Sequence, residues 1–218
     1  MQITKDIKSL KSKLANRPGI AVDIDETISW TIGWWVERMQ KLFGNPENLS
    51  VHQIIEKYNY TQNVPYWRTK EALDWMEARR QDNEVQKELP LIEGAISGLE
   101  AINKAVGIAA YITVRPKNVE EGTKYWLDIH NFPKAETVFR PDKIEHKDGN
   151  KWKAKVLEYL YPEVTGIIDD NPELIKYLDD SYKGHIYLYT DSYVPRVDSR
   201  IDVFSTWKDI VRGIIAKN

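Results

Sequence analysis

Two pairs of aspartates in this sequence have a spacing that suits metal-assisted chemistry. Asp23 and Asp25 close the apolar run 20–24, and Asp169 and Asp170 follow another apolar run. Because alternate residues of a strand point to the same side, Asp23 and Asp25 are expected to converge. In open parallel sheets such strand ends meet at one edge, so all four carboxylates would share one site.

Charge repulsion makes a bound cation the natural partner of these four carboxylates. Two like charges about 4 Å apart repel by roughly 4 kcal/mol at an effective dielectric constant near 20. Oxygen-only ligation, without cysteine or paired histidines, predicts Mg²⁺ rather than zinc. The alternative is that each aspartate pair caps the following helix.

Three further residues are candidates for binding phosphate. Thr113 follows a third apolar run, and its hydroxyl could bind a phosphoryl oxygen or form a turn or helix cap. Lys151 and Lys153 lie in a helical pattern shortly before Asp169, and one of them could balance the charge at the site. Lone lysines are usually solvated, so the lysine assignment depends on the strand ends. The four histidines are scattered without metal-ligand spacing and are assigned no chemistry.

Composition narrows the class of protein. The chain has 218 residues, is 42% hydrophobic and 29% charged, and has a formal net charge of −2, so it lacks a global field that would attract nucleic acid or an anionic membrane. The absence of cysteine excludes disulfides and thiol nucleophiles. No apolar stretch approaches the roughly 20 residues that span a bilayer, and no signal-peptide pattern opens the sequence. A cytoplasmic location is expected, and a homodimer is left open.

Hydrophobic periodicity predicts alternating strands and helices. The predicted strands are 20–24, 108–112, 137–139, 164–168 and 186–189. Helical spacing is found in 3–14, 94–106, 119–129 and 152–160. This alternation predicts an α/β fold with a Rossmann-like parallel sheet covered by helices on both faces.

Residues 28–90 carry helical patterns without a convincing strand, and hold five of the eight tryptophans. They predict a small helical domain inserted after the first strand. The aromatic residues are explained either as the core of this insertion or as a lid that stacks on a planar group of the substrate, with Trp30 and Trp34 as candidate contacts.

The ordered motifs resemble those of the haloacid dehalogenase (HAD) superfamily. The segment Asp23-Ile-Asp-Glu-Thr27, then Thr113, a lysine before a later helix, and Asp169-Asp170 follow the order of its four motifs. The resemblance implies an HAD-like core of residues 1–27 and 91–218, and a helical type 1 cap of residues 28–90.

Within the superfamily, the chain is most similar to 5'(3')-deoxyribonucleotidases and related 5'-nucleotidases. The similarity lies in the turn 89–95, in the fourth motif 167–172, and in the ending 200–210 with a final strand and a tryptophan-containing helix. The chain departs from them at the second motif, where it has Thr113-Val-Arg-Pro116 in place of Thr-Ser-Pro, as many other phosphatases of the superfamily do.

The resemblance implies a Mg²⁺-dependent phosphomonoester hydrolase. Asp23 would attack phosphorus to give an aspartyl-phosphate, and Asp25 would act as general acid and then as general base. Thr27 would support the loop and the substrate, Thr113 would bind the phosphoryl group, and Lys153, with Lys151 in reserve, would balance charge. Asp23, the Asp25 backbone carbonyl, Asp169 and Asp170 would hold the metal.

Other functions remain open at this stage. The substrate is expected to be a small phosphomonoester, nucleoside monophosphates first, with polynucleotide ends or another small metabolite as alternatives. A phosphotransferase and a non-catalytic binding protein share the fold. A receiver domain also gathers acidic strand ends, but the insertion 28–90 disfavours it.

Overall fold

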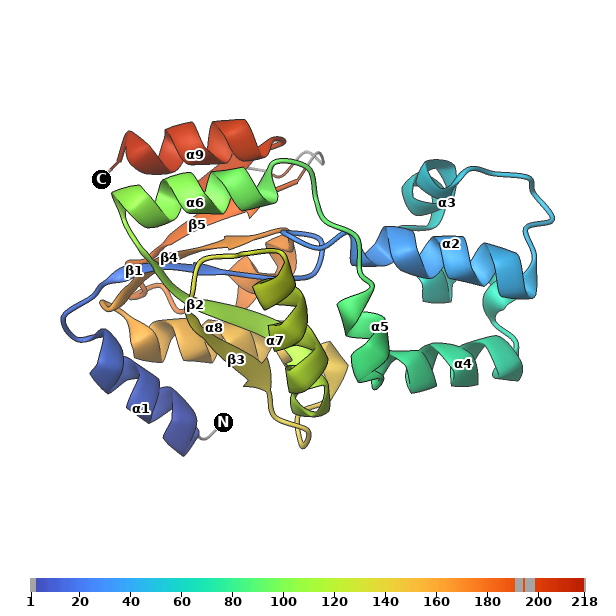
Figure 1. Cartoon of the computed structure of the whole chain (residues 1–218), viewed down its shortest axis with the longest axis horizontal. Coiled ribbons are helices and arrows are strands. Elements are labelled where there is room, and N and C mark those ends of the chain that lie inside the picture. Colours follow the sequence, from blue (N-terminus) through green and yellow to red (C-terminus); the bar gives the residue numbers. More distant parts are fainter. Residues whose placement is uncertain (1–2, 191–193, 195–198, 218) are drawn as a thin grey trace.

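The described residues, 3–190, 194 and 199–217, form a parallel six-stranded sheet flanked by helices in this computed structural model (Figure 1). The strands are β1 (Gly19–Val22), β2 (Ile108–Pro116), β3 (Glu136–Arg140), β4 (Val164–Asp169), β5 (His185–Tyr189) and β6 (Ile201–Phe204). Their order is β3-β2-β1-β4-β5-β6. The carboxyl end of β1 is therefore flanked by those of β2 and β4, which places the motifs side by side.

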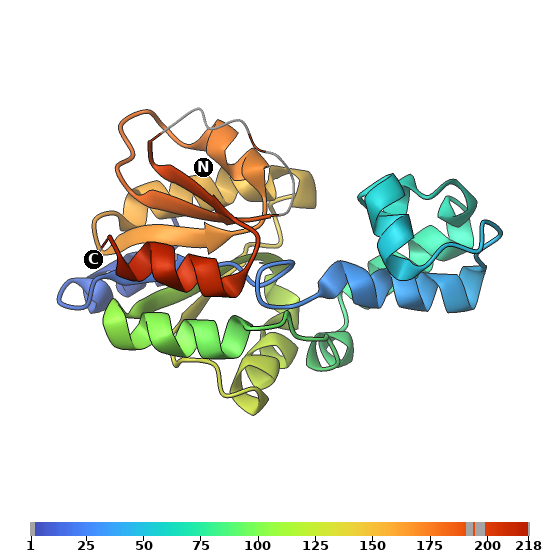
Figure 2. The same cartoon turned by 90° about the horizontal axis from the view of Figure 1, so that it is seen from above.

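Helices cover both faces of the sheet, as Figures 1 and 2 show from two directions. One face packs against α1 (Lys5–Leu14), α8 (Gly149–Leu160) and the short 3-10 helix η5 (Pro172–Tyr177). The other packs against α6 (Ala95–Ala105), α7 (Glu120–Ile129) and α9 (Trp207–Ile215). A parallel sheet buried in this way requires nearly continuous apolar strands, and all four residues of β1 are buried.

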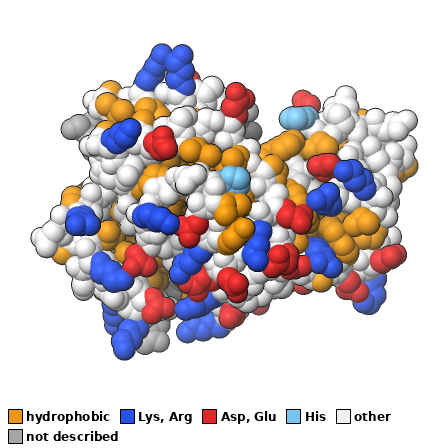
Figure 3. All heavy atoms as spheres, viewed as in Figure 1, with side chains coloured by type: hydrophobic (Ala, Val, Ile, Leu, Met, Phe, Trp, Pro, Cys, Tyr) orange, Lys and Arg blue, Asp and Glu red, His pale blue; other side chains and the backbone are white. Residues whose placement is uncertain are grey.

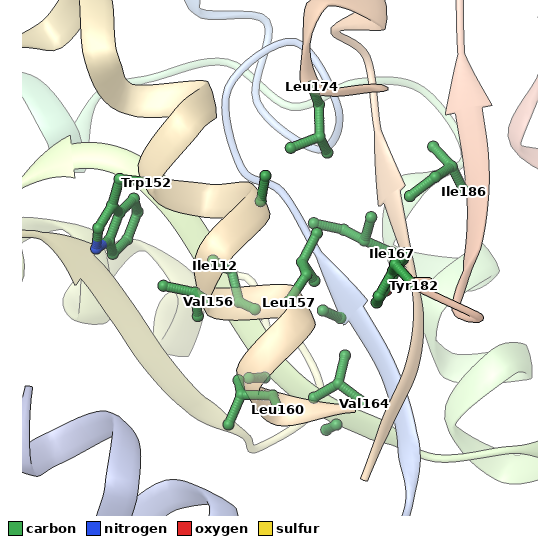
Figure 4. Packing of buried hydrophobic residues seen from close by; sticks show 14 of the residues in the cluster. Ile112, Trp152, Val156, Leu157, Leu160, Val164, Ile167, Leu174, Tyr182 and Ile186 are labelled. Atoms are coloured by element: carbon green, nitrogen blue, oxygen red, sulfur yellow. The ribbon is translucent and has the colours of Figure 1, made fainter. Parts of the chain in front are cut away.

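Helix α8 shows how packing on the sheet orients one site residue. Figure 4 shows the buried side of this helix against the sheet, with Trp152, Val156, Leu157 and Leu160 in the core. Each fully buried side chain of this kind contributes about 1.5–3 kcal/mol relative to exposure. Gly149 lets the helix start close to β2, because a Cβ atom there would lie 2.2 Å from Val114 Cγ1.

The segment after β1 forms a helical projection beyond the end of the sheet (Figures 1 and 2). It contains α2 (Thr31–Phe43), α3 (Val51–Tyr58), the 3-10 helices η1 (Thr61–Asn63) and η2 (Pro65–Trp67), and α4 (Lys70–Arg80). Its core consists of Val36, Met39, Ile54, Val64, Trp67, Ala72 and Met76. Figure 3 shows basic and acidic side chains interspersed over one face of the molecule.

Helix α5 (Asn83–Lys87) follows the projection but packs against α7. Val85 and Leu89 belong to the core beneath the sheet rather than to that of the projection. At Gly122 a Cβ atom would lie 2.1 Å from the Asn83 carbonyl oxygen, and the Gly122 N–H donates to Asn83 Oδ1 at 2.6 Å. The end of the projection is thereby anchored to α7.

The predicted α/β class and parallel sheet are confirmed. The five strands expected from apolar runs are present, and the final strand and helix implied by the ending 200–210 are β6 and α9. Residues 28–90 contain helices and no strand of the sheet. In the described part of the chain, no helix is long and apolar enough to cross a membrane. The division at residues 27 and 90 stays a prediction.

Candidate active site

Asp23 and Asp169 lie at the carboxyl ends of adjacent strands. Val22 of β1 is in register with Ile168 of β4, and the Asp23 N–H donates to the Ile168 carbonyl at 2.9 Å. Beyond Asp23 the chain turns tightly around the Ile24 carbonyl, which accepts from the N–H groups of Ile28 and Ser29, both at 3.0 Å. Thus the sheet fixes the two carboxylates as neighbours.

Lys153 lies between these two carboxylates. Its Nζ atom is 3.0 Å from Asp23 Oδ1 and 2.7 Å from Asp169 Oδ2, and the lysine side chain is 1% exposed. Burial opposes the charged form, but the two carboxylates outweigh it and raise the pKa of Lys153, so the ammonium group stays protonated. A buried charge is tolerated only when it is paired in this way.

Asp170 completes a cluster of three carboxylates. Ligand oxygens of Asp23, Asp169 and Asp170 all lie within 4.8 Å of one another. Burial, with the neighbouring carboxylates, raises the pKa of Asp23 to about 7 against the opposing charge of Lys153. Burial and the charges of Asp169 and Asp23 also raise the pKa of Asp170. Burial and mutual repulsion thus both oppose full ionisation of these carboxylates.

The donor set fits a hard divalent cation. With Asp25, four carboxylates face two cationic side chains, Lys153 and Arg115, which leaves two negative charges uncompensated when all are ionised. Oxygen ligands of this kind suit Mg²⁺. The cluster is thus a candidate metal site, and participation of the Asp25 backbone carbonyl stays a prediction.

Asp25 is held by Arg115 from β2 and by Thr31 from α2. Arg115 Nη2 donates to Asp25 Oδ1 at 2.7 Å and its Nε donates to Oδ2 at 3.0 Å, while Thr31 Oγ1 donates to Oδ1 at 2.6 Å. Burial acts to raise the pKa of Asp25, but the Arg115 charge and these hydrogen bonds lower it overall. Asp25 is therefore ionised in this arrangement.

Glu26 connects the same loop to the projection. Its φ angle is +55°, and its Oε1 accepts from the Ile32 N–H in the first turn of α2 at 2.5 Å. Burial raises the pKa of Glu26 to about 8, so this group adds little negative charge at neutral pH. Asp25 and Glu26 together tie the loop after β1 to the start of α2.

Thr113 lies on β2, on the other side of β1 from Asp169, and is completely buried. Its Oγ1 accepts from the Arg115 N–H at 3.1 Å, and its contact with a phosphoryl group stays a prediction. The register between β2 and β3 shifts after Thr113. This bulge accompanies the approach of the Arg115 side chain to Asp25.

The structure brings together Asp23, Asp25, Lys153, Asp169 and Asp170. It does not bring Lys151 to this group: Lys151 is exposed, because two positions along a helix correspond to about 200° of rotation. For the lysine, the structure therefore supports Lys153 over the reserve choice.

Two predicted substrate contacts, Thr27 and Trp34, are buried and have structural partners. Thr27 is fully buried, and its carbonyl accepts from Trp207 Nε1 at 3.1 Å, so it supports the loop and offers no surface to substrate. Trp34 is 7% exposed and stacks on Trp75 with ring centroids 6.3 Å apart. For Trp34 the core explanation fits, because burial leaves no free face for a substrate.

Trp30 is half-buried at the start of α2. Its ring stacks on His52 with centroids 5.3 Å apart, and it covers Gly33, where a Cβ atom would lie 2.3 Å from the indole. Trp30 is the more exposed of the two predicted aromatic contacts, and its role toward substrate stays a prediction.

Two residues that position the site, Arg115 and Trp207, had no role predicted from the sequence. Arg115 is part of the segment Thr113-Val-Arg-Pro116, but the sequence does not indicate the bulge that accompanies its contact with Asp25. Trp207 holds the Thr27 carbonyl from the start of α9. Gly98 of α6 permits this placement, since a Cβ atom there would lie 2.6 Å from the Trp207 ring.

Solved structures with a similar arrangement were found. A dehalogenase superposes with a TM-score of 0.56 and 13% identity, covering 93% of this chain and 99% of that one. A HAD family hydrolase from Deinococcus radiodurans R1, with bound phosphate and sodium, superposes with a TM-score of 0.52 and 14% identity, covering 93% and 96%. The chain has an α/β HAD-like fold.

A HAD-superfamily hydrolase from Ehrlichia chaffeensis has a TM-score of 0.47 and 14% identity, covering 92% of this chain and 97% of that chain. Neither a protein-family model nor a curated protein sequence matches this sequence. At 13–14% identity the structural likeness establishes the HAD-type fold, and the chemistry has to be argued from the site.

The raised pKa values predict how pH affects metal-free stability. The folded state binds more protons than the unfolded state between the ordinary pKa of Asp23 and about 7, so the free energy of unfolding falls as pH rises through this window. We expect the Tm in EDTA to fall by several degrees between pH 5 and pH 8, because about 1 kcal/mol shifts Tm by roughly 2–4 °C at this size.

Thermal scans of the wild type with and without Mg²⁺ check this prediction. Mg²⁺ should restore the Tm at pH 8, and Asp23→Asn should reduce both the pH dependence and the gain from Mg²⁺. Asp74→Asn is the matched control, because Asp74 forms an exposed ion pair with Lys70 in α4. A wild-type Tm that is indifferent to Mg²⁺ at pH 8 would contradict the metal site.

The hydrogen bond from Trp207 predicts a separate effect on the loop. Trp207→Phe leaves the Thr27 carbonyl without its buried donor, which should cost about 1–3 kcal/mol of stability and weaken Mg²⁺ binding measured by calorimetry. Trp67→Phe is the control: it removes a buried indole donor to the Gly44 carbonyl within the projection. Equal Mg²⁺ affinities of the two variants would show that Trp207 does not position the site.

Proposed function

We propose that this protein is a magnesium-dependent phosphomonoester hydrolase that acts through an aspartyl-phosphate on Asp23, with nucleoside monophosphates as the leading substrates. The supporting observation is the buried ion pairing of Lys153 with Asp23 and Asp169, next to Asp170. Thr113 lies on β2, which is the other neighbour of β1 in the sheet. A carboxylate nucleophile, hydrogen-bond donors for the phosphoryl group and a hard-cation site are then adjacent.

Each residue has a defined task in this proposal. An Asp23 oxygen bonds to phosphorus as the bond from phosphorus to the leaving oxygen breaks. Lys153 favours the ionised form of Asp23 and offsets charge on the phosphoryl oxygens, and Thr113 donates its hydroxyl proton to one of them. Bound at Asp23, Asp169 and Asp170, Mg²⁺ would neutralise further charge and orient the phosphoryl group.

Asp25 is proposed as the acid and base. The ion pair with Arg115 lowers the pKa of Asp25, which suits the second half of the reaction, where Asp25 takes a proton from water that attacks phosphorus and frees Asp23. Donating a proton to the leaving oxygen in the first half requires that Asp25 first leave this pair and take up a proton from solvent. The Thr31 bond gives the projection, proposed to be a mobile cap, a direct means of influencing that change.

A substrate panel tests the proposed function. We expect Mg²⁺-dependent phosphate release from at least one member among nucleoside monophosphates, sugar phosphates and 5'-phosphorylated oligonucleotides. Asp23→Asn should reduce release at least a hundredfold, because it removes the nucleophile. The panel includes 2-chloropropionate, since one structure with this fold is a dehalogenase. Chloride release without any phosphate release would replace the proposal, and full activity of Asp23→Asn would exclude the covalent route.

The position of Lys153 predicts a strong and local effect of its removal. Lys153→Met leaves two buried carboxylates unpaired, which should cost about 3–5 kcal/mol of stability and lower kcat at least a hundredfold. Lys155→Met is the matched control on α8, because Lys155 is exposed and pairs only with Glu158 in the described residues. Steady-state phosphate release and thermal unfolding measure both effects. Loss of activity in Lys151→Met but not in Lys153→Met would reverse the assignment.

A further inference from the structure

Arg140 is a buried cation at the same edge of the sheet. It ends β3, the strand beside β2, and is in register with Pro116. Its side chain is 5% exposed, its Nε donates to the Val114 carbonyl at 2.9 Å, and its Nη1 donates to the Ile144 carbonyl. No carboxylate in the described part of the chain lies within 4.0 Å of its guanidinium nitrogens. Among the described residues, Arg140 therefore carries a positive charge without an ionic partner.

Arg80 approaches this position from the projection. It is the last residue of α4, and the chain directly after it is fixed beside β2: Asn118 Nδ2 donates to Gln81 Oε1 at 2.6 Å, and Asn83 Nδ2 donates to the Asn118 carbonyl at 2.9 Å. Burial and the Arg80 charge lower the pKa of Arg140, against an opposing effect of Asp142. Arg140 lies opposite Pro116 and Gln81 contacts Asn118, so the two arginines lie beside the same short segment 116–118.

His146, on the loop between β3 and α8, belongs to the same group. Although its side chain is exposed, desolvation by neighbouring atoms and then the charges of Arg80 and Arg140 lower its pKa, while Asp25 acts in the opposite direction. Arg140 connects this group to the candidate active site, because it donates to the Val114 carbonyl and the next residue, Arg115, holds Asp25. We call Arg80, Arg140 and His146 the basic group.

The two nearby carboxylates, Asp142 and Glu77, do not bind the basic group firmly. Asp142 is exposed and forms no ion pair with Arg140 within the described residues. Glu77 pairs with Arg80 at 2.9 Å, but their side chains are 61% and 35% exposed. Such a surface pair contributes about 1 kcal/mol or less, so an anionic ligand can replace Glu77 at little cost.

We propose that the basic group binds a second phosphate group of the substrate, so that the preferred substrates are phosphomonoesters that carry another phosphate. This inference rests on the proposed function, because it requires the first phosphate to lie at Asp23. Two arginines match a phosphate dianion in charge and offer planar, paired donors. One arginine comes from the sheet and the other from the projection, so the second phosphate is bound between them.

The experiment compares two nucleotides that differ by one phosphate. Phosphate release with Mg²⁺ is measured for adenosine 5'-monophosphate and adenosine 3',5'-bisphosphate, and the ratio of their kcat/KM values is taken. We expect a wild-type ratio of at least ten in favour of the bisphosphate. Arg80→Gln should lower the ratio at least fivefold, mainly through KM, because the lost contact is made by the non-reacting phosphate.

Arg79→Gln is the control for Arg80→Gln. Arg79 precedes Arg80 on α4 and pairs with Asp82 at 2.6 Å, so the variant removes the same charge from the same helix and should keep the wild-type ratio. Arg80 is chosen over Arg140 because Arg140 also holds two backbone carbonyls. A wild-type ratio near one, or equal ratios in the two variants, would overturn the inference.

Calorimetry separates this inference from the proposed function. If the wild type hydrolyses neither nucleotide nor any other phosphomonoester, the hydrolase proposal fails, and binding of both nucleotides with Mg²⁺ is then compared directly. Tenfold tighter binding of the bisphosphate that is lost in Arg80→Gln and kept in Arg79→Gln would still support the basic group as a phosphate site. Equal binding of the two nucleotides would reject it.

Discussion

The ammonium group of Lys153 lies 3.0 Å from Asp23 and 2.7 Å from Asp169, and all three side chains are almost completely buried. Asp23 and Asp169 end adjacent strands, so without this cation two desolvated carboxylates would repel each other across the centre of the sheet. Packing of α8 on the sheet places the lysine between them. The contact that completes the core therefore also sets the charge of the candidate active site.

The loop after β1 extends this dependence to the projection. Asp25 accepts from Thr31 and Glu26 accepts from Ile32, both at the start of α2, and Ser29 forms an isolated bridge with Leu91, where the chain returns. A rotation of α2 must stretch or break these bonds. The position of the projection and the state of Asp25 are consequently linked, with Arg115 as the second partner of the carboxylate.

Much of this arrangement could be predicted from the sequence because buried parallel strands are continuous apolar runs, and the aspartates stand where two of these runs end. The alternation of side chains along a strand and the expected meeting of strand ends place Asp23 beside Asp169 before any contact is known. Arg115 could not be predicted, since its reach to Asp25 accompanies a bulge in β2. The role of Trp34 could not be predicted either, because an aromatic residue in an insertion has the same sequence signal whether it packs in a core or contacts a substrate.

The strand order also separates basic from acidic side chains along the carboxyl edge of the sheet, which the overall composition does not show. The chain has a formal net charge of only −2, yet along the carboxyl edge Arg140 and Arg115 lie on β3 and β2, while the carboxylate cluster lies on β1 and β4. A metal ion is favoured on the acidic side and anionic oxygens on the basic side. A near-neutral sequence thus excludes a global field without excluding a local one, because a local field depends on which strands become neighbours.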